Sequence, residues 1–238
     1  MKTIIITGAA SEVGKELVKQ LKDENLILID RDEKNLKAVA GKYKKSFYAC
    51  DISSIENLSE TFRAITKSYK KIDVLVNCAG LWTKGELSRQ GSEHFAEINT
   101  LERIKDIVDT NTFGVIAMIK NITPIMLKQG YGQIININSQ SSTMIEEFCP
   151  VYNASKHGSR AFSKAVLNDL ARGNIKLTDV CPGLIKTDFY KNANDPLSKD
   201  VMDTGLDAKD VAEVVKYLIS LPKNISIPSI EIKHMKNF

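Results

Sequence analysis

The chain has few residues of the types that bind metal ions, and their spacing does not fit a metal site. Its 238 residues include four cysteines and three histidines, and the histidines have no metal-like partners. Zinc sites usually draw on closely spaced pairs of such residues, but the cysteines are far apart: Cys50, Cys78, Cys149 and Cys181. Their apolar neighbours indicate buried, reduced thiols. We therefore expect no metal centre and a reducing compartment.

Long hydrophobic runs are also absent. No apolar stretch approaches the roughly 20 residues that a membrane-spanning helix needs. The run Ile4–Ile6 after Lys2 imitates a signal peptide, but it stops at Gly8, and Glu12 follows. The sequence therefore predicts a cytoplasmic protein that does not act on a membrane.

A patch of one charge is missing as well. Net charge is +4, from 33 Lys+Arg against 29 Asp+Glu, and the lysines are scattered as on solvated helix faces. The densest cluster, formed by Lys42, Lys44 and Lys45, lacks the arginine residues that are typical of a nucleic-acid groove. Repeats, low-complexity segments and linkers are absent too. We therefore expect no nucleic-acid partner and one domain over residues 1–238.

What the sequence does contain is an alternation of short apolar runs with amphipathic segments. Continuous apolar runs are typical of strands buried on both faces. The expected strands are 3–7, 26–29, 46–50, 73–77, 133–138 and 175–180, with an edge or irregular strand at 225–232 containing Pro228. The main expected helices are 55–69, 104–128 (perturbed near Pro124), 151–172 and 207–221. This alternation predicts the α/β class: a doubly wound parallel sheet, or Rossmann fold, with helices on both faces.

The ends of the first two expected strands suggest a dinucleotide site. Gly8–Gly14 joins a strand to a helix, where backbone amides and the helix N-terminus can face a phosphate. Asp30 ends the second strand, 22 residues after Gly8, where a carboxylate can bind an adenosine ribose. An ordinary strand–helix turn and a helix N-cap remain the alternative readings of these two features.

A second group of polar residues indicates acid–base chemistry. Tyr152 and Lys156 are four residues apart and share one face of an expected helix. A nearby ammonium favours phenolate, so such a pair can work as a general acid/base near neutral pH. Ser139 follows an apolar run, at the strand end where open α/β sheets bind ligands. Taken alone, the same stretch also fits a surface helix after a buried strand.

Six motifs in order make the chain resemble the short-chain dehydrogenase/reductase family. They extend over most of the chain, and together they are far more specific than any one of them. They are Thr7–Gly14, Asp51–Ile52, Asn77–Gly80, Asn111, the trio Ser139, Tyr152 and Lys156, and Pro182–Thr187.

The resemblance implies hydride transfer between a nicotinamide cofactor and an alcohol or ketone. It makes Tyr152 the general acid/base and Ser139 the group that stabilises the reacting oxygen. Lys156 would lower the phenol pKa and bind the nicotinamide ribose, and Asn111 would support a proton relay. The expected cofactor-binding positions are Gly8, Ser11, Glu12, Val13, Gly14, Asp30, Arg31, Asp51, Ile52, Asn77, Ala79, Gly80, Tyr152, Lys156, Pro182, Gly183, Ile185 and Thr187.

Two positions depart from the family pattern or complicate it. Glu12 replaces a glycine, and because a carboxylate would repel a pyrophosphate we expect its side chain to face solvent. Asp30 favours NAD by repelling the 2′-phosphate of NADP, whereas Arg31 could hold that phosphate. We weigh Asp30 above Arg31, so NAD is expected and NADP remains possible.

Several alternatives stay open at this point. A non-enzymatic cofactor sensor could use the same fold, although such proteins usually lack part of the catalytic set. Trp82 either covers substrate or caps the core, and residues 188–205 form a lid or a plain connector. A fatty-acyl 3-ketone, a polyol and a small hydroxy acid all remain candidate substrates. The two long helices, 104–128 and 151–172, correspond to the family's usual dimer interface, so a homo-oligomer is expected.

Overall fold

A computed structural model describes residues 1–83, 99–146, 149–193 and 197–237. Its strands are β1 (Thr3–Thr7), β2 (Asn25–Asp30), β3 (Ser46–Ala49), β4 (Val74–Asn77), β5 (Gly132–Ile137), β6 (Ile175–Pro182) and β7 (Ser229–Ile232). Its helices are α1 (Glu12–Gln20), α2 (Glu33–Tyr43), α3 (Ile55–Ser68), α5 (Leu101–Val108), α6 (Val115–Gln129), α7 (Pro150–Arg172), α8 (Lys199–Met202) and α9 (Ala208–Ser220). A π-helix, η1 (Asp109–Gly114), joins α5 to α6, and the 3-10 turns are η2 (Gln140–Ser142), η3 (Lys191–Ala193) and η4 (Met235–Asn237).

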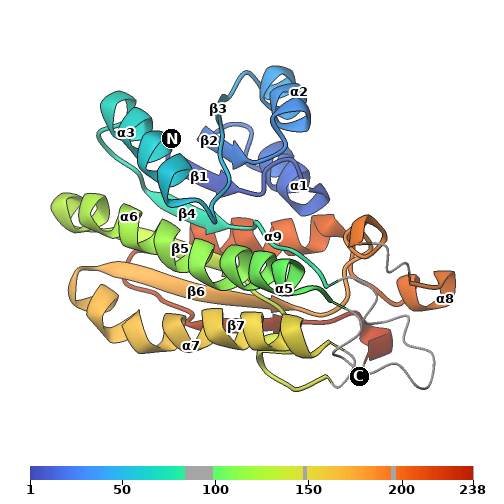
Figure 1. Cartoon of the computed structure of the whole chain (residues 1–238). Coiled ribbons are helices and arrows are strands. Elements are labelled where there is room, and N and C mark those ends of the chain that lie inside the picture. Colours follow the sequence, from blue (N-terminus) through green and yellow to red (C-terminus); the bar gives the residue numbers. More distant parts are fainter. Residues whose placement is uncertain (84–98, 147–148, 194–196, 238) are drawn as a thin grey trace.

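The strands form a single parallel sheet in the order β3-β2-β1-β4-β5-β6-β7 (Figure 1). The first strand, β1, lies inside the sheet. The chain adds β2 and β3 on one side of β1 and then β4 to β7 on its other side, so the strand order changes direction between β1 and β4. The predicted doubly wound parallel sheet is therefore confirmed. The strand expected at 225–232 is shorter, and it lies at the edge beside β6, immediately after Pro228.

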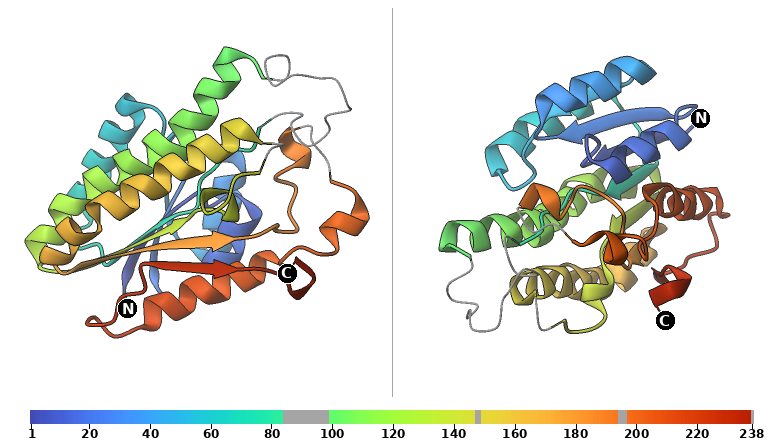
Figure 2. Two further views of the ribbon diagram at one scale, coloured as in Figure 1. Left: turned by 90° about the horizontal axis from the view of Figure 1, so that it is seen from below. Right: turned by 90° about the vertical axis from the view of Figure 1, so that its right-hand side faces the viewer.

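Helices cover both faces of the sheet because alternate strand residues point to opposite sides. Ile4 and Ile6 pack in the core under α1, α2 and α9, whereas Ile5 packs in the core under α3, α6 and α7. Figure 2 shows these two helical layers with the sheet between them. Both faces of the central strands β1, β2 and β4 are buried, which explains their continuous apolar runs, whereas the edge strands β3 and β7 are largely exposed.

The long helix expected at 104–128 is divided by η1. Pro124 does not interrupt α6, which runs through it to Gln129; the irregular turn instead lies earlier, at Asp109–Gly114. The expected perturbation near Pro124 was therefore wrong in its position. At Gly114 an added Cβ would lie 2.8 Å from the Ile52 side chain, so a small residue lets this turn pack closely against the loop after β3.

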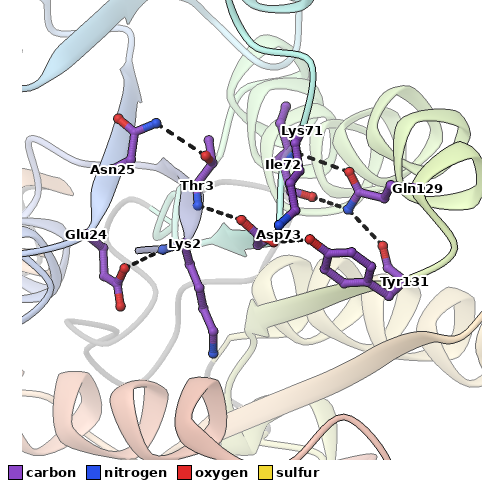
Figure 3. Close-up of polar contacts among 9 residues, drawn as sticks. All are labelled: Lys2, Thr3, Glu24, Asn25, Lys71, Ile72, Asp73, Gln129 and Tyr131. Atoms are coloured by element: carbon purple, nitrogen blue, oxygen red, sulfur yellow. Dashed lines mark hydrogen bonds and ion pairs between the residues drawn. The ribbon is translucent and has the colours of Figure 1, made fainter.

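Polar contacts brace the amino ends of the strands (Figure 3). Asp73, just before β4, accepts hydrogen bonds from the Thr3 amide at 2.8 Å and from the Tyr131 hydroxyl, and it pairs with Lys71 at 3.1 Å. Gln129 bonds both the amide and the carbonyl of Ile72. These contacts satisfy polar groups where β1, β4 and β5 begin, so this end of the sheet is closed by its own side chains.

Among the described residues, we find no helix that combines the length and the apolar character needed to cross a bilayer.

Candidate active site

The carboxyl ends of the central strands open onto a cavity of about 620 Å³. Ligands of open α/β sheets bind at this edge, where the strand order reverses. Most of the predicted site residues line it together: Gly8, Ser11, Glu12, Val13, Asp30, Arg31, Asp51, Ile52, Ala79, Gly80, Ser139, Tyr152, Lys156, Pro182, Gly183, Ile185 and Thr187. Residues at or just after the ends of six strands, β1 to β6, thus meet in one cavity.

Three predicted residues do not line the cavity. Gly14 lies in α1, where an added Cβ would come within 2.1 Å of the Gly8 carbonyl oxygen. Asn77 is buried in β4 and donates from Nδ2 to Asn136 Oδ1 at 2.9 Å. Asn111 is also fully buried, behind Leu81. Gly14 and Asn77 therefore support the cavity walls rather than facing into the cavity.

The glycine-rich turn has the geometry of a phosphate cradle. Gly8 adopts a positive φ of 66°, and a Cβ there would lie 2.7 Å from the Ala79 amide nitrogen. Only glycine fits this position without strain. The Ser11 hydroxyl caps α1 by accepting from the Gly14 amide at 3.0 Å and donates to the Gly8 carbonyl at 2.7 Å. The N-terminus of α1 is thereby fixed at the edge of the cavity.

Glu12 connects this turn to the segment that follows β6. Its side chain is exposed, as predicted, and its Oε2 accepts from the Asp188 amide at 2.6 Å. The sequence alone gave no sign of this contact, because the two residues are 176 positions apart. Glu12 thus holds the start of the 188–193 segment against the glycine-rich turn.

Asp30 is held rigidly at the end of β2. Its Oδ2 accepts from the Ala10 amide and its Oδ1 from the Asp32 amide, both at 2.9 Å. The carboxylate lines the cavity beside Arg31, whose side chain is exposed. A fixed anion with remaining lone pairs can accept further hydrogen bonds from a ligand's hydroxyl groups.

Ser139, Tyr152 and Lys156 meet at the opposite end of the cavity. Tyr152 and Lys156 lie one turn apart on α7, and Lys156 Nζ is 5.7 Å from the centre of the Tyr152 ring. Lys156 Nζ donates to the Ile137 carbonyl at 3.2 Å, at the end of β5. Ser139, two residues later, hydrogen-bonds the Tyr152 phenol. All three side chains are nearly inaccessible to solvent.

Burial sets the protonation of this pair. It raises the pKa of Tyr152 above its ordinary value, although the Ser139 hydrogen bond opposes the shift. It lowers the pKa of Lys156 from 10.5 to about 8, against the attraction of Cys78, Cys181 and Asp179. The expected lowering of the phenol pKa is therefore not found, because the loss of water on burial has the largest influence on this pKa.

Asn111 joins the site through the backbone and α7. It lies in η1, where Nδ2 donates to the Leu81 carbonyl at 2.9 Å and to Ser155 Oγ at 3.0 Å, while Oδ1 accepts from the Leu81 amide at 2.8 Å. An added Cβ on Gly80 would lie 3.4 Å from Oδ1 and 3.7 Å from Lys156 Nζ. The wide π-helical turn thus places this amide close to the lysine.

A chain of polar side chains lies behind Ser139, and no local sequence pattern indicates it. The Ser139 hydroxyl accepts from the Ser141 amide at 3.1 Å and lies 3.2 Å from Ser141 Oγ. Ser141 in turn donates to Glu146, whose other oxygen accepts from Gln140 at 3.3 Å. This chain restrains the Ser139 side chain from the side away from the cavity.

An aromatic cluster covers Tyr152. The Trp82 ring centre lies 4.5 Å from that of Tyr152, 4.9 Å from that of Tyr190 and 6.3 Å from that of Phe189. Only Trp82 was considered from the sequence, with two alternatives; it lines the cavity and is also buried. The pairing with Phe189 and Tyr190 depends on a long-range approach that no local pattern reveals.

The described residues contain no group of three or more His, Cys, Asp or Glu side chains placed to hold a metal ion. All four cysteines are free thiols, and burial raises the pKa of Cys78 to about 12. His94 and part of the segment 188–205, including Pro196, lie outside the described residues.

Known proteins resemble this chain along nearly its whole length. Residues 2–198 match the family model described as short chain dehydrogenase. An uncharacterized oxidoreductase of Staphylococcus saprophyticus is 27% identical over 244 residues, covering 98% of this chain and 97% of the relative. The farnesol dehydrogenase of Aedes aegypti is 25% identical over 248 residues, covering 98% and 95%.

A solved structure shares both fold and extent. The 3-ketoacyl-(acyl-carrier-protein) reductase from Brucella melitensis, complexed with NADH, is 25% identical and superposes with a TM-score of 0.87. The match covers 100% of this chain and 98% of that one.

Proposed function

Because the chain belongs to the short-chain dehydrogenase family, we propose that this oxidoreductase interconverts an alcohol and a ketone with Tyr152 as its general acid/base. One observation carries the proposal: Ser139, Tyr152 and Lys156 meet at one end of a cavity whose other end holds the glycine-rich turn and Asp30. Acid–base groups and a dinucleotide cradle thus share one space.

The residues present fit a nicotinamide dinucleotide. Gly8 has no side chain, so the phosphates can approach the backbone of the glycine-rich turn closely. Asp30 offers a fixed acceptor for the ribose hydroxyls. Lys156, Gly80 and Ile185 line the same cavity as Tyr152. When bound, the nicotinamide ring supplies or accepts the hydride. The protein's own part is to orient the reactants and to move a proton.

Tyr152 Oη gives a proton to the ketone oxygen during reduction and takes one from the alcohol during oxidation. Ser139 Oγ donates a hydrogen bond to the same oxygen and stabilises negative charge that develops there. Lys156 Nζ, in its ammonium form, favours the phenolate and binds the ribose nearest the reaction. Asn111 holds the Leu81 backbone beside Lys156 and supports the passage of protons to solvent.

The first prediction tests the acid/base. Tyr152→Phe should abolish turnover while leaving the cofactor dissociation constant within a few-fold, because the change removes the proton donor and keeps the ring. Steady-state rates and fluorescence titration with NADH measure the two effects. Tyr217→Phe is the matched control, since Tyr217 is 54% exposed on α9. If Tyr152→Phe kept more than about a tenth of kcat, or ~1.4 kcal/mol of barrier, Tyr152 would not be the acid/base.

The second prediction concerns cofactor choice. The carboxylate of Asp30 would face the 2′-phosphate of NADP, so the wild type should favour NAD in kcat/KM by at least about tenfold, or ~1.4 kcal/mol. Asp30→Ala should lose most of that preference. Arg31→Ala is the control, and it should weaken use of NADP without changing use of NAD. A wild-type preference for NADP would instead make Arg31 the determinant.

We further propose that the chain acts in a reducing, cytoplasmic environment as a homo-oligomer. The free thiols of the structure are consistent with the first part.

A further inference from the structure

We infer that the substrate is a neutral ketone or secondary alcohol with an apolar ring next to the reacting carbon. The inference rests on the proposed function and deepens it. It comes from the aromatic cluster, defined as Trp82, Phe189 and Tyr190, which packs around the proposed acid/base Tyr152 and lines the same cavity.

The cluster comes from two distant segments that meet over Tyr152. Trp82 follows β4, and Phe189 and Tyr190 follow β6. The Trp82 ring is tilted by 56° against Tyr152, and Tyr190 meets Trp82 edge-on at 70°. The ring centre of Phe189 lies 6.4 Å from that of Tyr152 and 5.7 Å from that of Tyr190. These separations are those of favourable ring pairs.

A ligand whose oxygen reaches Tyr152 and Ser139 must place the group beside that oxygen against these rings. An apolar ring can replace the ring–ring contacts that it displaces. A polyol would leave its hydroxyl groups against aromatic surface without partners, and unpaired buried polar groups are costly. The cluster therefore selects an apolar ring over a polyol or a hydroxy acid.

The charges around the cluster favour a neutral ligand. Many of the charged cavity residues lie at the glycine-rich turn and the end of β2, including Glu12, Lys15, Asp30 and Arg31. Beside the rings, Lys156 Nζ faces the Ile137 carbonyl, and Arg103 donates to the Trp82 carbonyl. Asp188, next to Phe189, and Glu146, near Tyr152, carry negative charge. Charges of both signs therefore lie beside the rings, and they do not form a patch of one sign that would attract an ion. A carboxylate would lose its water against ring surface, which makes its burial unfavourable.

The test compares ketones that share one ring and differ in charge. With NADH as reductant, kcat/KM is measured for acetophenone, 4-acetylbenzoate and 4-acetyl-N,N,N-trimethylanilinium, together with 2-butanone, dihydroxyacetone and pyruvate. We expect acetophenone to exceed each of the others by at least about tenfold, or ~1.4 kcal/mol. Preference for a charged ring, for dihydroxyacetone or for pyruvate would overturn the inference and leave the proposed function standing. Absence of turnover with every compound would count against both.

Substitutions in the aromatic cluster test whether its rings cause the preference for an aromatic ketone. Trp82→Ala should lower kcat/KM for acetophenone at least tenfold and for 2-butanone less than threefold. Phe189→Ala should act in the same direction, and because Phe189 is only partly buried it keeps the test valid if Trp82→Ala does not fold. Tyr217→Ala, an exposed tyrosine on α9, is the control and should change neither value. Equal losses for the two ketones would contradict the inference.

A binding measurement is independent of turnover. The chain contains one tryptophan, so its tryptophan fluorescence reports on Trp82 alone. Titration of the Tyr152→Phe variant in the presence of NAD with 1-phenylethanol should give a saturable change without turnover, and glycerol at the same concentrations should give none. A saturable response to glycerol alone would overturn the inference.

Discussion

At the scale of single residues, burial shifts the pKa values of Tyr152 and Lys156 in opposite directions, raising the first and lowering the second. The neutral forms of Tyr152 and Lys156 are both favoured, because each loses water when its charged form is buried. Spacing in the sequence correctly placed the two side chains on one helical face. It gave no measure of their burial; for Tyr152 this depends on Trp82, which packs against it from a distant part of the chain and is itself in contact with Tyr190.

The third prediction concerns the pH dependence of NADH binding and follows from the lowered pKa of Lys156. Burial lowers the pKa of Lys156 to about 8, so its ammonium form is present below that pH and is lost as the pH rises through it. If the ammonium binds the cofactor ribose, the dissociation constant of NADH should increase roughly tenfold between pH 7 and pH 9. Fluorescence titration across this range measures it.

Lys156→Arg provides the comparison for that measurement. A guanidinium stays charged throughout, so the variant's affinity should vary little with pH, even if it is weaker overall. An NADH dissociation constant that stayed constant in the wild type from pH 7 to pH 9 would show that Lys156 charge does not contribute to binding.

The sequence did not reveal the contacts by which residues from other segments restrain the candidate site residues. Ser139 was found from its place after an apolar run, but the Ser141–Glu146 contacts behind it were not. Glu12 was expected to face solvent, and it does; its bond to the Asp188 amide joins two segments that only the folded sheet brings together. Local patterns identify which residues can act, whereas tertiary packing decides what restrains them.

At the scale of elements, strands were easier to predict than irregular helical turns. A strand buried on both faces has a continuous apolar run that marks its position. The π-helix η1 has no such signature: Asp109–Gly114 looks like ordinary helix, and a proline further on attracted the prediction instead. The wider π-helical turn lets the Asn111 side chain bond both the Leu81 carbonyl and Ser155 Oγ. We therefore attribute the π-helix to these tertiary contacts and not to a local sequence pattern.

The fourth prediction concerns a buried carboxyl in β6. Asp179 is 2% exposed and its Oδ1 accepts from Ser163 at 3.0 Å and from Asn136 at 3.2 Å. Burial raises its pKa, although these bonds and nearby Arg160 oppose the shift. A carboxyl whose folded pKa is raised stabilises the fold at pH values below its unfolded pKa, and that contribution is lost as pH rises through the folded value.

Asp179→Asn should therefore raise Tm at pH 7, and the gain should shrink as the pH approaches 4. The amide oxygen keeps both accepted hydrogen bonds and removes the buried charge. Thermal unfolding followed by circular dichroism measures the effect. Asp169→Asn is the control, because Asp169 is an exposed partner of Arg172 and should change Tm little. A lower Tm for Asp179→Asn at pH 7 would mean that the carboxylate is fully compensated by its neighbours.

At the scale of the whole molecule, the two ends of the sheet have separate tasks. Asp73 and Gln129 brace the amino ends of the strands with hydrogen bonds to Tyr131 and to the backbone (Figure 3). The carboxyl ends carry Asp30, Ser139 and the cavity. This division follows from parallel strands, whose like ends share one edge, and for that reason the sequence order alone predicted the end of the sheet at which the cavity lies.

The fifth prediction is that the chain forms at least a dimer through α7. Ala154, Ala161 and Ala165 are exposed on one face of that helix, at spacings of seven and four residues. Val108 and Phe113 are also exposed apolar residues, 38% and 37%, in α5 and η1, which both pack against α7. Small side chains allow close approach of a second copy, and burial of this apolar surface would favour association.

Light scattering after size exclusion should therefore give at least twice the 26.5 kDa chain mass. Ala161→Arg adds bulk and charge to the middle of the face and should shift the protein toward the chain mass at micromolar concentration. Tyr217→Arg makes a similar change on α9, on the other side of the sheet, and should leave the mass unaltered. A wild type that ran as a monomer at micromolar concentration would refute the prediction. If dissociation alone abolished activity in Ala161→Arg, the partner copy would be needed to hold α7, and with it Tyr152 and Lys156, in place.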